Sequence, residues 1–434
     1  MESEIGHLGY SITLKSIPAH FLENIRTELY VLPIANPNFP TNDKPYPVFR
    51  ISKSKVYLPR YYGIEKYGLV KNTIEFYQNC NLEFNGNIRD IQQQTIDATL
   101  KTLDQFGGGL ISLDTGLGKT VVALKLISLL KVKTLIIVHA EFLLEQWIAR
   151  IKQFLPEARI GVIRQEKCEY QDVDITVAML QSIIKREDYP KDCFKEFGLT
   201  VIDECHHIGS KTFSSIFYKV QTKYMIGLSA TPERKDGLSK VIYWFLGPQI
   251  IHIKRETNKP SIKIIQTGLA VIDKFNKLGK INNPTMITDL TVNKERNDII
   301  INVIKDYLKF GRKILVLSDR RNHCEYLLEC LKHNSISAGI YLGGMKTQDR
   351  ELSVKCSVIL GTYQASGEGF DVPELDTLIL ATPKSDIEQA VGRILRQKNE
   401  NDPVVIDITD SFSIFKAQSY KRKKFYKANE YKVF

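Results

Sequence analysis

The stretch LDTGLGKT, Leu113 to Thr120, lies between two apolar runs and contains residue types that bind polyphosphates. A Gly-rich turn between a strand and a helix exposes backbone N–H groups at the positive end of the helix dipole, where phosphate oxygens bind. Lys119 would then reach the β- and γ-phosphates of a nucleotide, and Thr120 would hold Mg²⁺. Leu113 stands where the first Gly of the pattern G-x-x-x-x-G-K-[ST] belongs, so an ordinary strand-to-helix turn is the alternative.

A pair of carboxylates, Asp203 and Glu204, ends the apolar run LTVID. A carboxylate at the carboxyl end of a strand, beside a phosphate loop, is placed to hold Mg²⁺. Glu204 is placed to activate an attacking water as a general base. An acidic pair alone would indicate little, but together with Lys119 and Thr120 it predicts ATP hydrolysis.

The stretch QAVGRILR contains Arg393 and Arg396, which are three residues apart and so share one face of an expected helix. Guanidinium groups keep their charge and bind phosphate oxygens in a fork, as an arginine finger does, which raises rates by about 10³ to 10⁵. The alternative is an exposed basic helix face. Because these arginines follow a different series of strands from the phosphate loop, we expect closure of two α/β units to complete the nucleotide site.

Two series of short apolar runs must position these residues. Continuous Val, Ile and Leu runs predict parallel strands that are covered on both faces. Helical patterns separate the runs, so the sequence predicts two consecutive doubly wound α/β units. The first series comprises LISL, TLIIV, DITVAM, LTVID and YMIGLS, and the second comprises KILVLS, AGIYL, CSVILGT, DTLILA and PVVIDIT.

The length of 434 residues is too great for one core and indicates two or three domains. Pro- and Tyr-rich composition sets the N-terminal segment apart, and the polar passage after the first strand series indicates a connector. The expected parts are an N-terminal accessory α+β domain (1–85), an ATP-binding domain (86–250), a connector (251–290), a second domain (291–412) and a basic C-terminal tail (413–434).

The composition indicates a polyanionic partner, because the formal net charge is +11. The N-terminal residues have no apolar signal region, and no run approaches the roughly 18 apolar residues of a membrane span, so we expect a soluble intracellular protein without a membrane partner. The seven cysteines are scattered and odd in number, which favours reduced thiols over a disulfide framework.

An ordered set of nine motifs between residues 89 and 396 resembles the helicase motifs of superfamily 2. The motifs are RDIQ, LDTGLGKT, VHAEFLLEQW, TVAMLQS, DECH, SATP, LVLSDR, GTYQASGEGFD and QAVGRILR. SATPERKDG and GEGFDVPELD resemble the branch that contains the XPB and UvsW DNA helicases and the poxvirus transcript-release DNA helicase. The DEAD-box RNA helicases fit less well, since their second motif ends in Asp where His206 stands. The resemblance implies two tandem RecA-like domains.

The resemblance also implies roles for individual residues. Gln92 would read adenine, Gly369 and Asp371 would complete the nucleotide pocket, and Ser229 and Thr231 would couple hydrolysis to movement. The full set implied to bind the nucleotide is Arg89, Gln92, Thr115, Gly116, Gly118, Lys119, Thr120, Gly369 and Asp371. The remaining implied roles are catalysis by Lys119, Asp203 and Glu204, coupling by Ser229, Ala230 and Thr231, and γ-phosphate sensing by Gln389, Arg393 and Arg396.

Contacts with the nucleic acid should come from polar groups on the side opposite ATP. The candidates by motif position are Gln181, Ser182, Arg320 and Thr362. Contacts of this kind are made to the nucleic-acid backbone, so they are independent of base sequence and sensitive to salt.

These observations predict an ATP-driven DNA helicase or duplex translocase with ATP and Mg²⁺ as cofactors. The resemblance implies 3′ to 5′ movement on single-stranded, forked or branched DNA, with RNA:DNA hybrids as further candidates. Relatives in large DNA viruses imply a transcription or replication partner, a location in the host cytoplasm or virion, and a monomer or weak oligomer. The alternatives are an RNA helicase and a nucleotide-switched binding or annealing module, which would need neither Glu204 nor the paired arginines.

Overall fold

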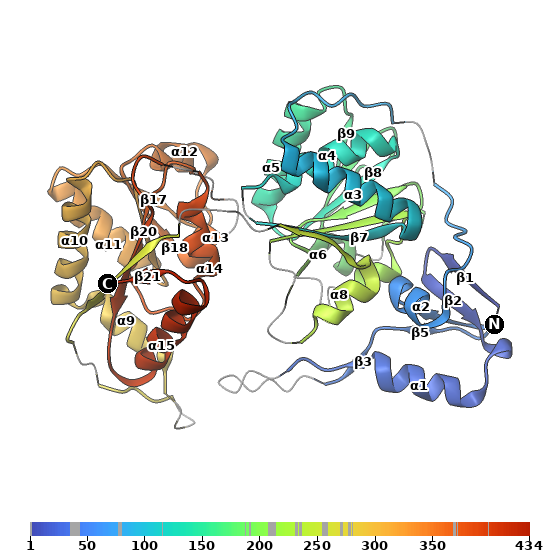
Figure 1. The fold of residues 1–434 in the computed structure, drawn as a ribbon, viewed down its shortest axis with the longest axis horizontal. Coiled ribbons are helices and arrows are strands. Elements are labelled where there is room, and N and C mark those ends of the chain that lie inside the picture. Colours follow the sequence, from blue (N-terminus) through green and yellow to red (C-terminus); the bar gives the residue numbers. More distant parts are fainter. Residues whose placement is uncertain are drawn as a thin grey trace. The chain divides into compact units, whose positions relative to one another are not determined.

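The chain forms two compact units, Met1–Arg255 and Glu256–Phe434, which are drawn in Figure 1. No helix in the described part of the chain is long and apolar enough to cross a membrane. The computed structural model describes residues 2–34, 44–76, 80–114, 116–186, 188–190, 192–206, 214–230, 233, 237–253, 259–269, 272–276, 279, 281–367, 370, 372–397 and 399–434.

The first unit is built on an eight-stranded sheet in the order β10-β9-β11-β8-β12-β13-β7-β14, parallel except for the β9–β10 pair. The five runs predicted as the first strand series are β7, β8, β11, β12 and β13, and this prediction is confirmed. The strands are β7 (Gly108–Leu113), β8 (Thr134–Val138), β9 (Ile160–Arg164), β10 (Lys167–Cys168), β11 (Ile175–Met179), β12 (Leu199–Ile202), β13 (Tyr224–Ser229) and β14 (Gln249–Ile253).

Helices cover both faces of this sheet, which explains the unbroken apolar strands. Along β8, Leu135 and Ile137 enter one core cluster and Ile136 enters the other. Buried residues of α3, α4 and α5 lie in one core cluster and those of α6 and α8 in the other, and these helices can be followed in Figure 1. Their bounds are α3 (Asp90–Phe106), α4 (Lys119–Leu130), α5 (Glu141–Phe154), α6 (Leu180–Lys185) and α8 (Ser239–Leu246), and a short 3₁₀ helix spans Ser215–Tyr218.

The N-terminal segment forms its own antiparallel sheet, in the order β1-β2-β6-β5, and a separate β3–β4 pair. It shares a hydrophobic core with the parallel sheet, and the buried Arg60 donates hydrogen bonds to the carbonyls of Thr222, Lys223 and Phe106. The N-terminal segment thus belongs to the first compact unit, Met1–Arg255, and a domain boundary near residue 85 stays a prediction. The elements are β1 (Ser3–Gly6), β2 (Gly9–Thr13), a 3₁₀ helix (Leu14–Ser16), α1 (Ala19–Leu29), β3 (Tyr30–Val31), β4 (Tyr46–Pro47), β5 (Arg50–Ile51), β6 (Lys55–Leu58) and α2 (Arg60–Tyr67).

The second unit has a seven-stranded parallel sheet in the order β17-β18-β16-β19-β20-β15-β21. The second predicted strand series is confirmed as β16 to β20, so the structure contains the two RecA-like parallel-sheet units and the small N-terminal sheet expected from the sequence. The strands are β15 (Ser261–Gln266), β16 (Ile314–Ser318), β17 (Ala338–Tyr341), β18 (Val358–Thr362), β19 (Thr377–Leu380), β20 (Val404–Thr409) and β21 (Lys432–Val433).

The helices of the second unit also cover both faces of its sheet. Buried residues of α10 and α11 pack in one core cluster, whereas those of α14 and Tyr426 of α15 pack in another. The helices are α9 (Asn283–Val292), α10 (Lys294–Leu308), α11 (Arg321–His333), α12 (Thr347–Val354), α13 (Tyr363–Gly367), α14 (Glu388–Gly392) and α15 (Ser413–Ala428), with a 3₁₀ helix at Arg393–Leu395.

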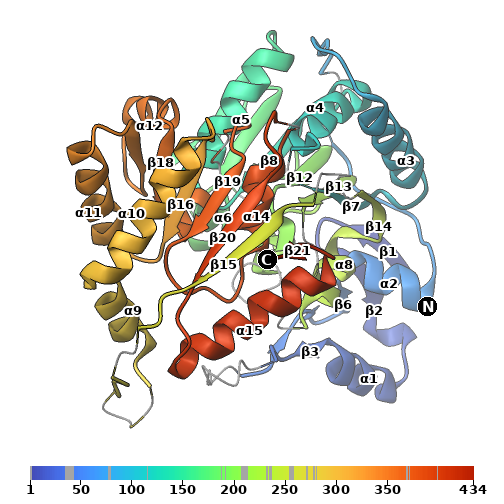
Figure 2. The same ribbon diagram turned by 60° about the vertical axis from the view of Figure 1, so that its left-hand side comes forward.

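Two segments expected to lie outside the domains are integral to them. The expected connector supplies β15, which pairs with β20, and its Ile262 is fully buried. The expected basic tail is α15, which contacts β20 (Figure 2). In α15 the buried Arg422 pairs with Asp407 of β20, at 2.9 Å between Nη2 and Oδ1, and Tyr426 donates to the same carboxylate. The sequence indicated a solvated tail because the outer face of this helix is cationic. Its buried face was not recognised.

A buried ion pair joins α10 to the segment after β20, and it yields a stability prediction. Arg296 contacts Asp410 at 3.0 Å between Nη2 and Oδ2, and both side chains are fully buried. Arg296→Ala would leave the carboxylate without its cation, so we expect a loss of about 3–5 kcal/mol in unfolding free energy. The exposed pair of Arg321 and Glu325 gives the control Arg321→Ala, with an expected change below about 1 kcal/mol. Equal urea midpoints for both variants would contradict the prediction.

Candidate functional site

The loop between β7 and α4 has the backbone that a phosphate site requires. Gly116 and Gly118 have φ values of 85° and 91°, in the left-handed region that favours glycine. A Cβ at Gly118 would stand 2.3 Å from Nε2 of Gln92, so a larger residue would have to move the Gln92 side chain. Helix α4 begins at Lys119, directly after this turn, and Thr120 is its second residue. Thr115 lies outside the described residues.

Two polar residues at the start of α3 hold this loop. Nη2 of Arg89 donates to the carbonyl of Leu117 at 2.6 Å, and Nε2 of Gln92 donates to the same oxygen at 3.1 Å. Gln92 is 3% exposed and also accepts from the backbone N–H of Arg89. These two hydrogen bonds hold the loop through the carbonyl oxygen of Leu117. The reading of adenine by Gln92 stays a prediction.

The strand order brings the predicted catalytic residues to one edge of the sheet. Parallel strands β12, β13 and β7 are neighbours, and their carboxyl ends lead to Asp203, Ser229 and the phosphate loop. Nζ of Lys119 donates to the carbonyl of Leu113 at 3.1 Å. Its positive charge also lowers the pKa of Asp203, against the larger raising effects of burial and Glu204. The ammonium and the two carboxylates therefore interact across this edge.

The carboxylate of Asp203 lies in an environment that disfavours its charge. Burial and the neighbouring charge of Glu204 raise the pKa of Asp203 to about 6. Oδ2 of Asp203 accepts from Nε1 of Trp147 at 2.8 Å, and Oδ1 accepts from the backbone N–H of Glu204 at 3.0 Å. Glu204 itself has a φ of 46°, a costly value for this residue type that is frequent at functional sites. A buried carboxylate of raised pKa next to a second carboxylate, beside a glycine-containing loop, fits a divalent cation with a bound nucleotide.

His206 connects the hydrolytic residues to the residues expected to couple hydrolysis to movement. Its Nδ1 lies 3.1 Å from Oγ of Ser229 and 3.3 Å from Oε2 of Glu204. The sequence indicated no role for His206 in hydrolysis or coupling, and it did not identify Trp147 as the partner of Asp203. The only sequence signal for Trp147 was its place at the end of VHAEFLLEQW. Ala230 follows Ser229 directly, whereas Thr231 lies outside the described residues.

The residues expected to sense the γ-phosphate differ in exposure. Gln389 is exposed on α14. Arg393 is 6% exposed and donates from Nη1 to the carbonyl of Phe370 at 2.7 Å, whereas Arg396 is half-buried. The expected continuous helix ends at Gly392, where a 3₁₀ turn begins. Gly369 and Asp371 lie outside the described residues.

The four candidates for nucleic-acid contact make local hydrogen bonds. Gln181 donates to the carbonyl of His139 at 2.6 Å, and Oγ of Ser182 accepts from the backbone N–H of Gln165. Arg320 donates to the carbonyl of Pro284 at 2.6 Å and to Oγ1 of Thr288. Oγ1 of Thr362, at the end of β18, accepts from the backbone N–H of Ala365. Their contacts with a nucleic-acid strand stay predictions.

Two known families match the chain, one in each of its two compact units. Residues 85–234 match the family described as "Type III restriction enzyme, res subunit", and residues 295–398 match the "Helicase conserved C-terminal domain". A protein of Acanthamoeba polyphaga mimivirus, named "Putative ATP-dependent RNA helicase", is 33% identical over 452 residues, covering 100% of this chain and 86% of the relative. The chain belongs to the superfamily 2 helicases. It is an ATP-dependent helicase.

Other relatives of this helicase also come from large DNA viruses. A protein of African swine fever virus that carries the same functional name is 29% identical over 382 residues, covering 79% of the helicase and 73% of the relative. A protein of Invertebrate iridescent virus 6, named "Putative helicase", is 30% identical over 366 residues, covering 80% of the helicase and 82% of the relative. The resemblance seen in the sequence is thus confirmed at the level of the superfamily and its viral relatives.

Proposed function

We propose that this helicase uses hydrolysis of MgATP at the β7–α4 loop to separate nucleic-acid duplexes that contain an RNA strand. The observation that carries the ATPase part is the cluster of Lys119, Asp203 and Glu204 at one edge of the first sheet, where burial and the charge of Glu204 raise the pKa of Asp203. The RNA part is supported by the names of the mimivirus and African swine fever virus relatives, both of which are called RNA helicases. It replaces the DNA duplex as the first candidate substrate.

Each residue of the cluster has a task in this reaction. Backbone N–H groups at the start of α4 and the ammonium of Lys119 bind phosphate oxygens. Thr120 and Asp203 would hold Mg²⁺, which when bound neutralises phosphate charge. Glu204 accepts a proton from the attacking water, and the nearby Nδ1 of His206 orients its carboxylate. The hydrogen bond from Nε1 of Trp147 to Oδ2 restricts the orientation of the Asp203 carboxylate.

DNA is the second candidate substrate. The match of residues 85–234 to a restriction-enzyme subunit supports it, as does the sequence DECH in place of a DEAD motif. For either polymer we propose movement from 3′ to 5′, with a transcription or replication assembly as the partner.

Stimulation of ATP turnover distinguishes the two substrates. ATP hydrolysis by the full chain is measured with single-stranded RNA, single-stranded DNA and an RNA:DNA hybrid at one salt concentration. Stronger stimulation by RNA or the hybrid than by DNA supports the proposal. Stimulation by DNA alone would establish the second candidate. Tight nucleic-acid binding without any turnover would instead support the nucleotide-switched binding module.

We propose further that Arg396 stabilises the transition state of hydrolysis. A guanidinium near the developing phosphate charge acts more on the transition state than on bound ATP. Arg396→Ala should therefore lower stimulated ATPase about 10²-fold and change the nucleotide Kd by less than about tenfold. Because Arg393 is buried and bound to Phe370, its replacement would also disturb the fold, so Arg396 gives the cleaner test. Arg321→Ala is the control, and unchanged turnover in Arg396→Ala would refute the role.

A further inference from the structure

The exposed face of α15 is strongly cationic. None of its 16 residues is acidic, and the buried Arg422 is already paired with Asp407. The exposed lysines of the helix make no ion pair with any carboxylate that the structure describes. They are Lys416, Lys421, Lys423, Lys424 and Lys427. The positive charge of this face is therefore available to a polyanion.

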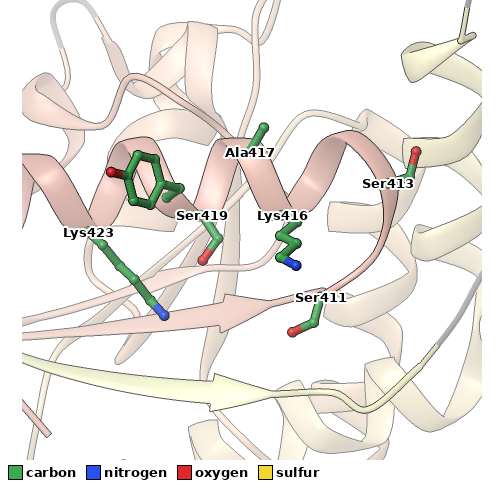
Figure 3. A pocket seen from close by; sticks show the side chains of 7 residues that line it. Ser411, Ser413, Lys416, Ala417, Ser419 and Lys423 are labelled. Carbon is green, nitrogen blue, oxygen red and sulfur yellow. The ribbon is translucent and has the colours of Figure 1, made fainter.

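A hollow of about 520 Å³ lies along the same helix, lined by Ser411, Ser413, Lys416, Ala417, Ser419, Tyr420 and Lys423. Figure 3 shows Lys416, Ser419 and Lys423 projecting from one side of α15, with Ser411 across from them. The hollow thus combines ammonium groups and hydroxyls, which donate hydrogen bonds to phosphate and sugar oxygens. Its volume is in the range of about 300–1,000 Å³ that is usual for ligand sites and is sufficient for one nucleotide.

Tyr420 adds an aromatic surface to this hollow. Its side chain is 60% exposed, and Nζ of Lys424 lies 5.1 Å from the centre of its ring. An exposed ring between cations can stack on a nucleic-acid base, an interaction worth about 1–3 kcal/mol per base. Stacking of this kind requires a base that is free of its partner strand. The ring therefore favours a single strand over a duplex.

We propose that the α15 hollow, defined by the seven lining residues above, binds the sugar–phosphate backbone of a single-stranded nucleic acid, with Tyr420 stacked on a base. The site is separate from the four candidate contacts named by motif position. This inference rests on the proposed function, because the strand would be the one on which the helicase acts.

The spacing along the helix fits such a strand. Lys416, Tyr420, Lys423 and Lys427 recur at intervals of four, three and four residues, so they form one stripe on the helix surface. At a rise of about 1.5 Å per residue the stripe is about 16 Å long, enough to follow several nucleotides. Lys421 lies about 120° around the helix from the stripe at about 100° per residue, and it can serve as a control.

Binding of fluorescent single-stranded oligonucleotides by the full chain tests the proposal, measured by anisotropy over a series of salt concentrations. Lys416→Ala/Lys423→Ala/Lys427→Ala removes three charges of the stripe. This variant should weaken binding at least tenfold. It should also reduce the magnitude of the slope of log K against log salt by about 2, because each lost phosphate contact contributes about 0.7 to the slope for a single strand. Tyr420→Ala should weaken binding about tenfold. The matched control, Lys294→Ala/Lys332→Ala/Lys421→Ala, should change the affinity by less than about threefold.

The outcomes separate this inference from the proposed function. All the substituted side chains are exposed, so basal ATPase without nucleic acid should be unchanged and reports intact folding. Equal affinity and equal salt slope in the stripe and control variants would overturn the inference, as would a loss confined to duplex binding or to an acidic protein partner. A wild-type ATPase that responds to no nucleic acid would refute the proposed function, while weakened strand binding by the stripe variant would still support the α15 hollow.

Discussion

Replacing Lys119 by alanine should lower ATP hydrolysis by about 10³-fold and leave the fold intact. Removal of one preorganised donor from a charged transition state costs about 10²- to 10³-fold, and Lys119 supplies a full charge as well as a donor. Among the described residues, its Nζ donates one hydrogen bond, to the carbonyl of Leu113 at the end of β7. The loop itself is held by Arg89 and Gln92, which the substitution does not touch. Steady-state phosphate release and the urea midpoint measure the two expectations.

Lys125→Ala is the matched control for this variant. Lys125 is on the same helix, α4. Its Nζ lies 5.3 Å from the ring centre of Phe84, a residue of the segment that precedes α3. We expect its turnover to stay within about threefold of the wild type. Near-normal hydrolysis in Lys119→Ala would show that the β7–α4 loop is not the nucleotide site.

Glu204→Gln should stop hydrolysis by a different route. The amide has the size of the carboxylate but cannot take a proton from water, and loss of a general base costs about 10²- to 10⁴-fold. Asp203 keeps its hydrogen bond from Trp147, so ATP should still bind. The expected result is a turnover reduced about 10³-fold with a nucleotide Kd within about threefold of the wild type. Single-turnover hydrolysis and equilibrium nucleotide binding measure these quantities separately.

Glu145→Gln, an exposed position on α5, is the control for the loss of one carboxylate. It should hydrolyse ATP normally. If Glu204→Gln also hydrolyses ATP normally, another residue activates the water, and the role given to Glu204 is wrong.

The sheets were predictable from the sequence because parallel strands are buried on both faces. Runs such as TLIIV and PVVIDIT are mainly apolar at consecutive positions, and the strands they form are buried throughout. The sequence did not predict that α15 packs on the sheet. Arg422 and Tyr426 are buried because they contact Asp407 of β20, and a contact with another element leaves no pattern within the helix itself. A cationic helix that packs on one side has the same composition as a solvated tail.

The candidate site was predictable only as far as its local motifs reach. LDTGLGKT and DECH each have a fixed spacing, so their residues could be named from the sequence. The hydrogen bond from Trp147 to Asp203 and the contact of His206 with Ser229 depend on which strands are neighbours in the sheet. The burial of Arg393 depends on the end of α14 at Gly392 and on the carbonyl of Phe370. Such contacts are set by tertiary packing, which no single motif encodes.

Strand displacement tests the central claim, that ATP hydrolysis drives duplex separation, most directly. The substrate is a partial duplex with a fluorescent RNA strand and a single-stranded 3′ extension, with the matching DNA duplex measured in parallel. The wild-type chain should release the labelled strand only when ATP is present, and Glu204→Gln should release none while still binding ATP. Release without ATP, equal release by Glu204→Gln, or active ATP turnover that separates neither duplex would contradict the account.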